Sequence, residues 1–353
     1  MAEGSRAATD LVTGGTGIVG AHLLHALARR GRRVRALVRG TSDREVVRRI
    51  FRHHGDDSGE LFACIEWQEG DLLDILSLEE AMQDVERVLH AAALVSFDPR
   101  DNSELARVNV AGTRNVVNAA LGMRIAMLGY VSSTASIGRV NGDDLITEAV
   151  PWEQTRRTSP YAVSKFRAEM EVERGRAEGL PTVSVNPCVV LGPGPAGRSS
   201  MTLVERIARG TRFHPPGSNA VVDARDVADT LIRLCEAGIT HGRYLLVGEN
   251  ITYKDLFQHL AVAFGARVPH LVAAPWMLRT GSALEAARSL LTGSRALITP
   301  YTVDSALSER SYSTEALQKV LPTRFRSAQD SIEDVVRWVK ESEGLNGPPP
   351  SNG

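Results

Sequence analysis

The chain has little cysteine, little lysine, no long apolar run and almost no net charge. Its three cysteines, Cys64, Cys188 and Cys235, lie far apart in the sequence. This excludes a disulfide framework or a closely spaced zinc ligand set and predicts a reducing, cytoplasmic location. Because no apolar run or signal segment is long enough, we expect neither a membrane partner nor export. A formal net charge of −1 excludes the basic field that nucleic-acid binding needs.

What the chain does contain is enough apolar material for a full core, since 43% of its 353 residues are hydrophobic. Short apolar segments alternate with segments of helical periodicity. This alternation predicts the α/β class, with a Rossmann-type doubly wound parallel sheet. We expect strands at residues 9–13, 34–38, 62–67, 88–92, 127–132 and 182–191, and helices at 18–30, 77–82, 102–121 and 160–178.

Beyond the last of these strands the alternation stops, which predicts a smaller, mostly helical C-terminal substrate lobe beside a dinucleotide-binding domain. Asp10 is unusual in a buried parallel strand, and we expect it at the exposed start of that strand. A proline-rich end is expected to be disordered. We expect the dinucleotide-binding domain to comprise residues 1–195 together with 223–250. The lobe comprises 196–222 and 251–343, and the tail comprises 344–353.

A glycine-rich stretch at residues 11–20 follows the first expected strand and leads into the first helix. Gly14 lets the chain turn sharply out of the strand, and Gly17 removes a side chain where a pyrophosphate would approach. Gly20 lets the helix pack closely on the sheet. The first N–H groups of that helix then point at the anion. The spacing Gly-x-x-Gly-x-x-Gly differs from the common Gly-x-Gly-x-x-Gly, but its place between strand and helix favours a dinucleotide site over a simple turn.

A tyrosine and a lysine carry the strongest chemical signal. Tyr161 and Lys165 stand four residues apart on one face of an expected helix, and Lys165 is one of only four lysines among 41 basic residues. A neighbouring ammonium should lower the tyrosine pKa from its usual value near ~10, so the pair can exchange a proton with a hydroxyl or carbonyl oxygen. At the end of the fifth expected strand, Ser133, with Thr134 as second choice, can hydrogen-bond the same oxygen.

Further motifs accompany these residues: Thr13-Gly14-x-x-Gly17-x-x-Gly20, Asp71-Leu72, His90-Ala91-Ala92-Ala93, Asn109-Val110-x-Gly112-Thr113, Ser133, Tyr161-x-x-x-Lys165 and Asn186-Pro187. Together they resemble the extended short-chain dehydrogenase/reductase family. Within it the chain is most similar to dihydroflavonol-4-reductase-like enzymes and bacterial relatives of the NAD-dependent epimerase/dehydratase type. The resemblance covers about residues 9–250 and continues weakly to about 340.

This resemblance implies a nicotinamide cofactor, with Tyr161 as catalytic acid/base and Lys165 holding the nicotinamide ribose. Ser133 would polarise the substrate oxygen, and Asn109 would support the site. A homodimer through two long helices is implied as well. The implied cofactor contacts are Thr13, Gly14, Thr16, Gly17, Ile18, Val19 and Gly20 in the glycine loop, Asp71 and Leu72 at the adenine, Ala91, Ala92 and Ala93 along the cofactor, Asn109, and Pro187, Cys188 and Val189 at the nicotinamide.

The end of the second expected strand bears on the choice between NAD and NADP. An acidic residue there would bind the ribose 2′-hydroxyl of NAD, but the chain has Arg39, and no carboxylate follows until Asp43. A guanidinium suits the 2′-phosphate of NADP, and Ser42 or Arg44 could assist. NADP is therefore expected, and NAD stays the alternative because Arg39 is one of many arginines.

The substrate residues carry a weaker signal. Glu148 and Trp152 lie in a stretch that resembles the one before the tyrosine in the reductase branch. Phe97, Trp152, Met201 and Phe213 could form an apolar substrate pocket, although ordinary packing explains each of them equally well. The expected substrate is a small carbonyl compound or alcohol.

A histidine pair is the only sequence feature that suggests a metal. His53 and His54 stand near Asp56 and Asp57, in what reads as a polar helix end and loop. We interpret the segment as solvated charge and expect no metal site.

Three functions fit these residues. The first is NADPH-dependent reduction of a ketone or aldehyde, with Tyr161 as general acid. The second is epimerisation or dehydration of a nucleotide sugar with tightly bound NAD, against which Asn186-Pro187 counts because such epimerases carry Arg-Pro there. The third is a non-catalytic NADP-binding regulator, which the retained Tyr161 and Lys165 disfavour.

Overall fold

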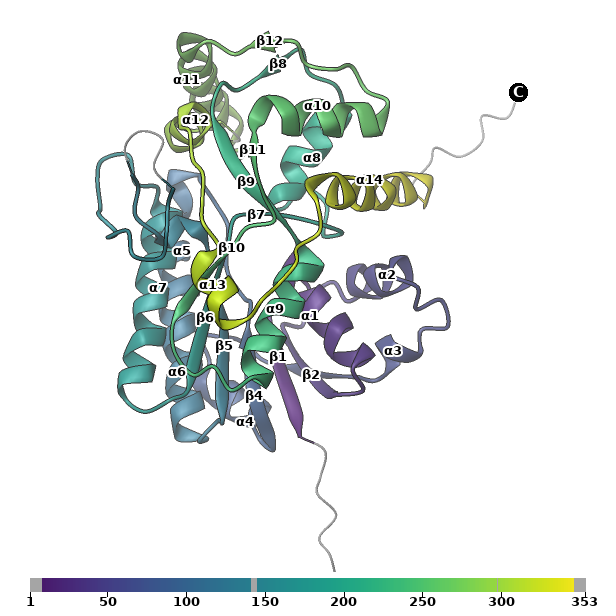
Figure 1. Cartoon of the computed structure of the whole chain (residues 1–353), viewed down its shortest axis with the longest axis vertical. Helices are drawn as coiled ribbons and strands as arrows, with labels where there is room; N and C mark the ends of the chain where they lie inside the picture. Colours follow the sequence, from purple (N-terminus) through teal and green to yellow (C-terminus); the bar gives the residue numbers. More distant parts are fainter. Residues whose placement is uncertain (1–7, 141–144, 297, 346–353) are drawn as a thin grey trace, which may run out of the picture.

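The computed structural model describes residues 8–140, 145–296 and 298–345. At its centre is a seven-stranded sheet in the order β10-β6-β5-β4-β1-β2-β3, and every neighbouring pair of strands is parallel (Figure 1). The predicted doubly wound α/β class is therefore confirmed. The strands are β1 (Thr9–Thr13), β2 (Arg33–Val38), β3 (Ile65–Glu69), β4 (Val85–His90), β5 (Met127–Val131), β6 (Thr182–Pro187) and β10 (Arg243–Leu246).

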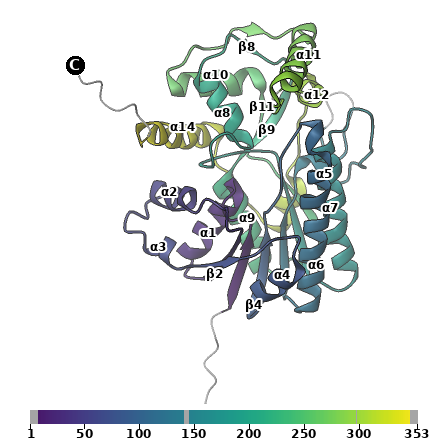
Figure 2. The same ribbon diagram turned by 180° about the vertical axis from the view of Figure 1, so that it is seen from behind.

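Helices cover both faces of this sheet, as the opposite views of Figures 1 and 2 show. One buried apolar cluster joins the sheet to α1, α2 and α9, and a second joins it to α4, α6 and α7. These two layers leave the carboxyl ends of the strands uncovered, and this is the edge at which such sheets bind ligands. The helices are α1 (Ile18–Arg29), α2 (Glu45–His53), α3 (Glu60–Ala63), α4 (Ile75–Ala81), α6 (Gly112–Gly122), α7 (Pro160–Ala177) and α9 (Ala224–Glu236).

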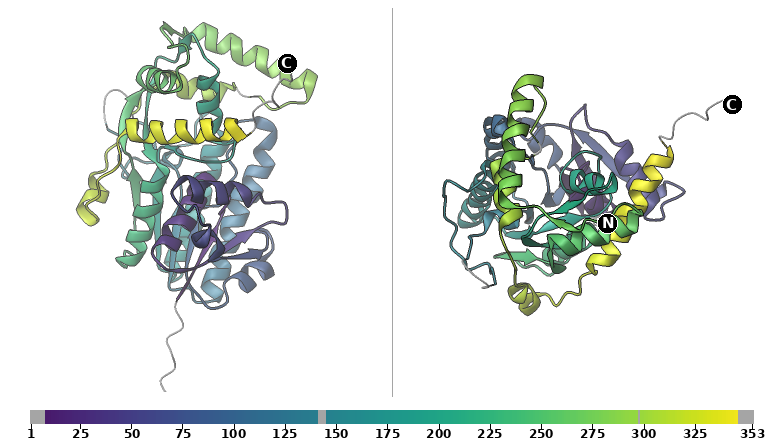
Figure 3. Two further views of the ribbon diagram at one scale, coloured as in Figure 1. Left: turned by 90° about the vertical axis from the view of Figure 1, so that its right-hand side faces the viewer. Right: turned by 90° about the horizontal axis from the view of Figure 1, so that it is seen from above.

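Above that edge lies a second group of elements built on a three-stranded sheet in the order β11-β9-β7. Figure 3 shows helices α8, α10, α11 and α14 around it, with α14 lying across the side of α1 and α2. The elements are β7 (Val189–Leu191), α8 (Ser200–Ala208), β8 (Phe213–His214), β9 (Ser218–Asp223), β11 (Glu249–Thr252), α10 (Tyr253–Phe264), β12 (Leu271–Val272), α11 (Pro275–Thr292), α12 (Pro300–Leu307), α13 (Glu315–Val320) and α14 (Ala328–Leu345).

Two predicted strands are wrong in their limits. The third strand does not begin at residue 62, because Glu60–Ala63 is helical and β3 starts at Ile65. The expected strand 182–191 breaks at Cys188, where the chain leaves the central sheet and β7 pairs with β9. The valines on both sides of Cys188 suit a strand equally well, so the pattern does not mark the point where the chain changes sheets.

The helix expected at 102–121 is present but irregular. A helical turn, α5 (Asn102–Leu105), and a π-helical segment, Ala106–Ala111, precede α6. Such π-helical turns occur frequently at functional sites, and this one carries Asn109.

The position expected for Asp10 is wrong. Its side chain is fully buried, and its two carboxylate oxygens accept hydrogen bonds from Arg87 at 2.7 and 2.8 Å and from Arg32 at 2.9 and 3.1 Å. A buried carboxylate is tolerated in a parallel strand when both oxygens are paired in this way.

The solvated state expected for His53 and His54 is also wrong. The His53 side chain has no exposed surface, and it lies against Asp334 and Glu341 of α14. Asp56 is likewise buried and accepts hydrogen bonds from backbone N–H groups. The cause is α14, which is more than 270 residues away in the sequence and covers this helix end.

Near the chain end, residues 344 and 345 belong to α14, and the rest of the predicted tail lies outside the described residues. Within the described ranges no helix combines the length and apolarity that crossing a bilayer requires.

Candidate active site

The glycine loop forms a cradle of bare backbone between β1 and α1. Gly14 has φ +71°, and a Cβ there would lie 2.6 Å from the Cα atom of Ala92. A Cβ on Gly20 would lie 2.0 Å from the Gly14 carbonyl oxygen. Gly17 is the N-cap residue of α1 and supplies no side-chain acceptor, so the first N–H groups of the helix remain available to an anion. The cradle fits the pyrophosphate of a dinucleotide.

Around this cradle, a buried histidine ties the strand ends together. His90 Nδ1 lies 2.6 Å from the Thr13 hydroxyl, and its Nε2 lies 3.0 Å from the Thr113 hydroxyl. Burial lowers the pKa of His90 to about 3, so the ring is neutral and can both donate and accept. Residues 91–93 leave β4 from this anchored position, and the Ala91 N–H donates to the Thr13 carbonyl at 3.2 Å.

The predicted tyrosine and serine meet at the carboxyl edge. Ser159 caps α7 by accepting a hydrogen bond from the Ala162 N–H at 3.1 Å, and Pro160 occupies the first helical position. Tyr161 therefore lies in the first turn of α7, where its phenol is hydrogen-bonded to Ser133. The Ser133 hydroxyl also accepts from the Ala135 N–H at 3.1 Å, which holds it in place.

The direction of the Tyr161 pKa shift differs from the expectation. Burial raises the pKa of Tyr161, and the hydrogen bond with Ser133 opposes this only in part. Lys165 does not act on it as expected, because its Nζ donates to the Tyr130 hydroxyl at 2.8 Å and to the Val131 carbonyl at 2.9 Å. In this arrangement Tyr161 is a protonated phenol at neutral pH, which is the form that donates a proton.

Lys165 itself is 1% exposed. Burial lowers its pKa to about 7, while the charge of Glu169 favours the ammonium. A lysine whose pKa lies near neutrality exists in both forms at physiological pH, which is typical of functional sites.

Sequence reasoning missed a buried carboxylate beside this lysine. Glu169 Oε2 accepts hydrogen bonds from Ser132 at 2.5 Å, Ser136 at 2.7 Å and Asn186 Nδ2 at 2.8 Å. Its Oε1 pairs with Arg243 at 3.1 Å. The network fixes the loop that carries Ser133. The available signal was the spacing of residues 161, 165 and 169, which places three polar side chains on one face of α7.

Asn109 links two segments of the carboxyl edge. Its Oδ1 accepts from the Leu94 N–H at 2.7 Å, and its Nδ2 donates to the Leu94 carbonyl and to the Ser164 hydroxyl, both at 2.9 Å. The side chain thus joins the loop after β4 to α7 and does not project toward a ligand.

Several further predicted cofactor residues lie near the carboxyl edge of the central sheet. Asp71 and Leu72 follow β3, where the Asp71 carboxylate accepts from the Leu73 N–H at 2.9 Å and the Leu72 side chain packs on Gly112. Thr16 lies in the glycine loop, and Ile18 and Val19 open α1. Pro187 ends β6 and Val189 begins β7. Burial raises the pKa of the Cys188 thiol between them, so the side chain stays neutral and packs as a small apolar group.

At the end of β2, Arg39 is exposed and forms no ion pair with any carboxylate that the structure describes. The Ser42 hydroxyl accepts a hydrogen bond from the Arg39 N–H at 3.0 Å, so it shapes the turn. Sequence reasoning overlooked Glu69, the last residue of β3. Its carboxylate lies against Gly40, where a Cβ would come within 2.6 Å of it.

The substrate candidates differ in whether they lie near Tyr161. The Phe97 ring lies edge-on to Tyr161 with centroids 5.6 Å apart, and the Thr134 hydroxyl hydrogen-bonds Tyr312. Trp152 instead stacks on Phe166 at 4.0 Å. Met201 is buried in the core. Phe97 therefore lies beside Tyr161, Thr134 contacts Tyr312, and Trp152 and Met201 pack. Phe213, also considered above, is exposed in β8.

Comparison with known proteins agrees with this geometry. The sequence profile of the NAD dependent epimerase/dehydratase family matches residues 11–248. The chain belongs to that family.

Relatives of this NAD-dependent epimerase/dehydratase family member include "Sterol demethylase protein B" of Methylococcus capsulatus, 31% identical over 77% of this chain and 79% of that one. "Putative dihydroflavonol 4-reductase" of Synechocystis is 29% identical over 93% and 94%. The crystal structure of gox2253 is 29% identical and superposes with a TM-score of 0.78, covering 96% of this chain and 99% of that chain. The chain is an enzyme of the NAD(P)-dependent, extended short-chain dehydrogenase/reductase type.

Proposed function

We propose that the protein reduces a ketone or aldehyde at the expense of NADPH, with Tyr161 as the proton donor. The observation that carries this proposal is the Tyr161 phenol, which burial keeps protonated and Ser133 holds by a hydrogen bond. A general acid must carry its proton before the reaction, and a carbonyl oxygen that gains negative charge must receive one.

The cofactor would lie with its pyrophosphate on the cradle of Gly14, Gly17 and Gly20, and its nicotinamide supplies hydride when bound. Within the chain, Ser133 positions the substrate oxygen, and Tyr161 donates the proton to it. Lys165, whose amine donates to Tyr130 and Val131, would supply a positive charge and a hydrogen bond to the cofactor ribose. Phe97 excludes water from the Tyr161 hydroxyl.

For the cofactor, Arg39 supports NADP, since an exposed guanidinium without a carboxylate partner can clamp a 2′-phosphate. Glu69, close to Gly40, is the residue that would favour the ribose hydroxyls of NAD instead. We also propose that the protein acts in the cytoplasm as a homodimer, and that residues 196–222 and 251–343 select the substrate.

The test of this function is NADPH oxidation at 340 nm with a panel of aryl and aliphatic ketones and aldehydes, repeated with NADH. Turnover that consumes one NADPH per alcohol formed supports the proposal. The family also contains epimerases and dehydratases, so nucleotide sugars are included. Conversion of a nucleotide sugar by protein purified with bound NAD, with no net NADPH use, would overturn it.

A further inference from the structure

A cluster of imidazole and carboxylate groups lies where α14 crosses α1 and α2, away from the residues described above. His53 and His54 end α2, and Asp334 comes from the middle of α14. One ligand-type atom from each of these three residues lies within 4.8 Å of the other two. His22 of α1 adjoins them, because its Nε2 is 3.0 Å from His54 Nε2.

The hydrogen bonds of the outer ring nitrogens orient this cluster inward. His22 Nδ1 lies 2.7 Å from the Ile18 carbonyl, and His53 Nδ1 lies 2.6 Å from the Glu341 carboxylate. Each acceptor can receive a hydrogen bond from the Nδ1 proton, so the Nε2 atoms of His22 and His53 are the ones directed into the cluster. This is the arrangement in which carbonyl and carboxylate groups hold metal-binding histidines.

The inward atoms already contact one another without an ion. His53 Nε2 lies 3.2 Å from Asp334 Oδ1, a contact in which a protonated His53 donates to the carboxylate. The second carboxylate oxygen, Asp334 Oδ2, is buried and has no hydrogen-bond partner. A divalent cation in the cluster would replace the His53 proton and would satisfy Asp334 Oδ2 as well.

The spacing fits a small divalent ion. Zn²⁺ binds histidine nitrogen and carboxylate oxygen at about 2.0–2.1 Å in a tetrahedron, which places neighbouring ligand atoms roughly 3.3–3.4 Å apart. The observed 3.2 Å between His53 Nε2 and Asp334 Oδ1 is close to that edge length, and the ligand atoms of all three residues lie within 4.8 Å of one another.

We propose that His53, His54 and Asp334 form a Zn²⁺ site that fastens the C-terminal helix α14 to α2. Water would complete the tetrahedron, and His22 lies beside the ligands, with its Nε2 3.0 Å from His54 Nε2. The site joins residues that are more than 270 positions apart.

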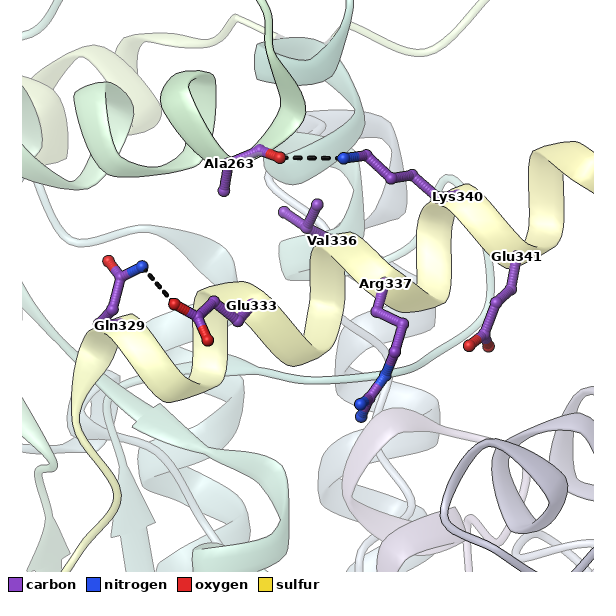
Figure 4. A pocket seen from close by; sticks show the side chains of 7 residues that line it. All are labelled: Ala263, Gln329, Glu333, Val336, Arg337, Lys340 and Glu341. Atoms are coloured by element: carbon purple, nitrogen blue, oxygen red, sulfur yellow. Dashed lines mark hydrogen bonds between the residues drawn. The ribbon is translucent and has the colours of Figure 1, made fainter.

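Two arginines are the groups that compete with the metal. Arg337 donates to Asp334 Oδ1 at 2.5 Å and approaches His53 Nε2 to 3.4 Å, and Arg225 lies 3.5 Å from Asp334 Oδ2. Figure 4 shows Arg337 and Glu341 on the side of α14 that faces away from α10. The Arg337 side chain is 59% exposed, so it can turn into solvent when the ion binds, while Arg225 keeps its own carboxylate, Asp223.

The experiment is a titration of untagged, chelator-treated full-length protein with Zn²⁺ by calorimetry, and with Co²⁺ by visible absorption. The background carries Cys64→Ser, because that exposed thiol can bind zinc adventitiously. We expect one equivalent, a rise in melting temperature on zinc addition, and the intense visible bands of four-coordinate cobalt.

Matched variants locate the site. His54→Gln and Asp334→Asn should each weaken zinc binding at least 10- to 100-fold, whereas His241→Gln, at an exposed histidine elsewhere, should leave it unchanged. Melting curves in chelator show whether each variant is folded; if one is not, the wild-type stoichiometry and cobalt spectrum still decide. No bound equivalent, or weak six-coordinate cobalt bands, would mean that protonated His53 alone bridges Asp334 and Glu341, and would overturn the proposal.

Discussion

Replacing Glu169 by glutamine should destabilise the protein and move its activity profile along the pH axis. The carboxylate accepts three hydrogen bonds at Oε2 and one charged hydrogen bond from Arg243 at Oε1. Glutamine has nearly the same shape, but one of its two terminal atoms is a donor. At least one of the partners must then face an N–H group, and Arg243 loses its counter-charge.

The magnitude follows from the burial of the pair. Removing the charge of one partner of a buried ion pair costs about 3–5 kcal/mol in the free energy of unfolding. The Arg243 side chain is one-quarter exposed, so water compensates part of the loss, and we expect about 3 kcal/mol. Glu169 also raises the pKa of Lys165. Without it that pKa falls further, and activity that needs the ammonium is lost at lower pH.

The assay is urea unfolding together with kcat/KM measured from pH 5.5 to 9. The matched control is Glu173→Gln on the same helix, whose carboxylate pairs with Arg176 at the surface. This exposed pair should contribute less than about 1 kcal/mol and leave the pH profile unchanged. Equal stability losses in the two variants, or an unshifted profile for Glu169→Gln, would refute the reasoning.

Three further predictions concern the cofactor site and the buried lysine. Gly14→Ala should lower the free energy of unfolding by at least about 1–2 kcal/mol because of its positive φ, with a further loss from the clash with Ala92, and it should weaken dinucleotide binding. The control Gly31→Ala, with φ +69° and no neighbour within 4 Å, should lower the melting temperature and leave dinucleotide binding unchanged. Arg39→Ala should weaken NADPH binding by roughly 10- to 150-fold, the equivalent of about 1.5–3 kcal/mol, in a fluorescence titration that shows NADH binding unchanged; an equal loss for both cofactors contradicts it. The pKa of Lys165 falls from its usual value to about 7 on folding, so above pH 7 the unfolded chain binds more protons than the folded one. The free energy of unfolding should therefore rise by roughly 2 kcal/mol between pH 7 and 9. The rise should be absent in Lys165→Met, and an identical rise in that variant would count against the lowered pKa of Lys165.

The parts of the site that local sequence determines were predictable. The glycine spacing between a strand and a helix specifies a backbone that can approach a phosphate. At both Gly14 and Gly20 a Cβ atom would clash with neighbouring backbone, so only glycine fits there. The positions of Tyr161 and Ser133 follow from where a helix begins and a strand ends. For these residues, neighbours within about twenty positions decide the outcome.

The features that depend on residues far away in the sequence could not be predicted from local patterns. The acidity of Tyr161 depends on burial and on where the Lys165 amine finds acceptors, and those acceptors belong to β5. Asp10 was misplaced because its partners come from elsewhere in the chain, Arg32 from the residue before β2 and Arg87 from β4. The sequence shows each charged residue but not its counter-charge.

The same limit applies to the chain's course and to its histidines. Residues 183, 185, 189 and 190 are all valine, so the stretch reads as one strand and does not show the change of sheet at Cys188. His53 and His54 look solvated until Asp334 of α14 is placed against them.

The most direct test of the account is the Tyr161→Phe variant, assayed with the best carbonyl substrate from the panel. The substitution removes only the hydroxyl, so NADPH affinity measured by fluorescence titration should stay within about twofold, while kcat falls by about 10²- to 10⁴-fold, the range for a lost general acid. Tyr244→Phe, at a tyrosine of β10 whose hydroxyl donates to the His241 carbonyl, should change neither value. A Tyr161→Phe enzyme that keeps kcat within tenfold of the parent would contradict the claim that this phenol donates the proton.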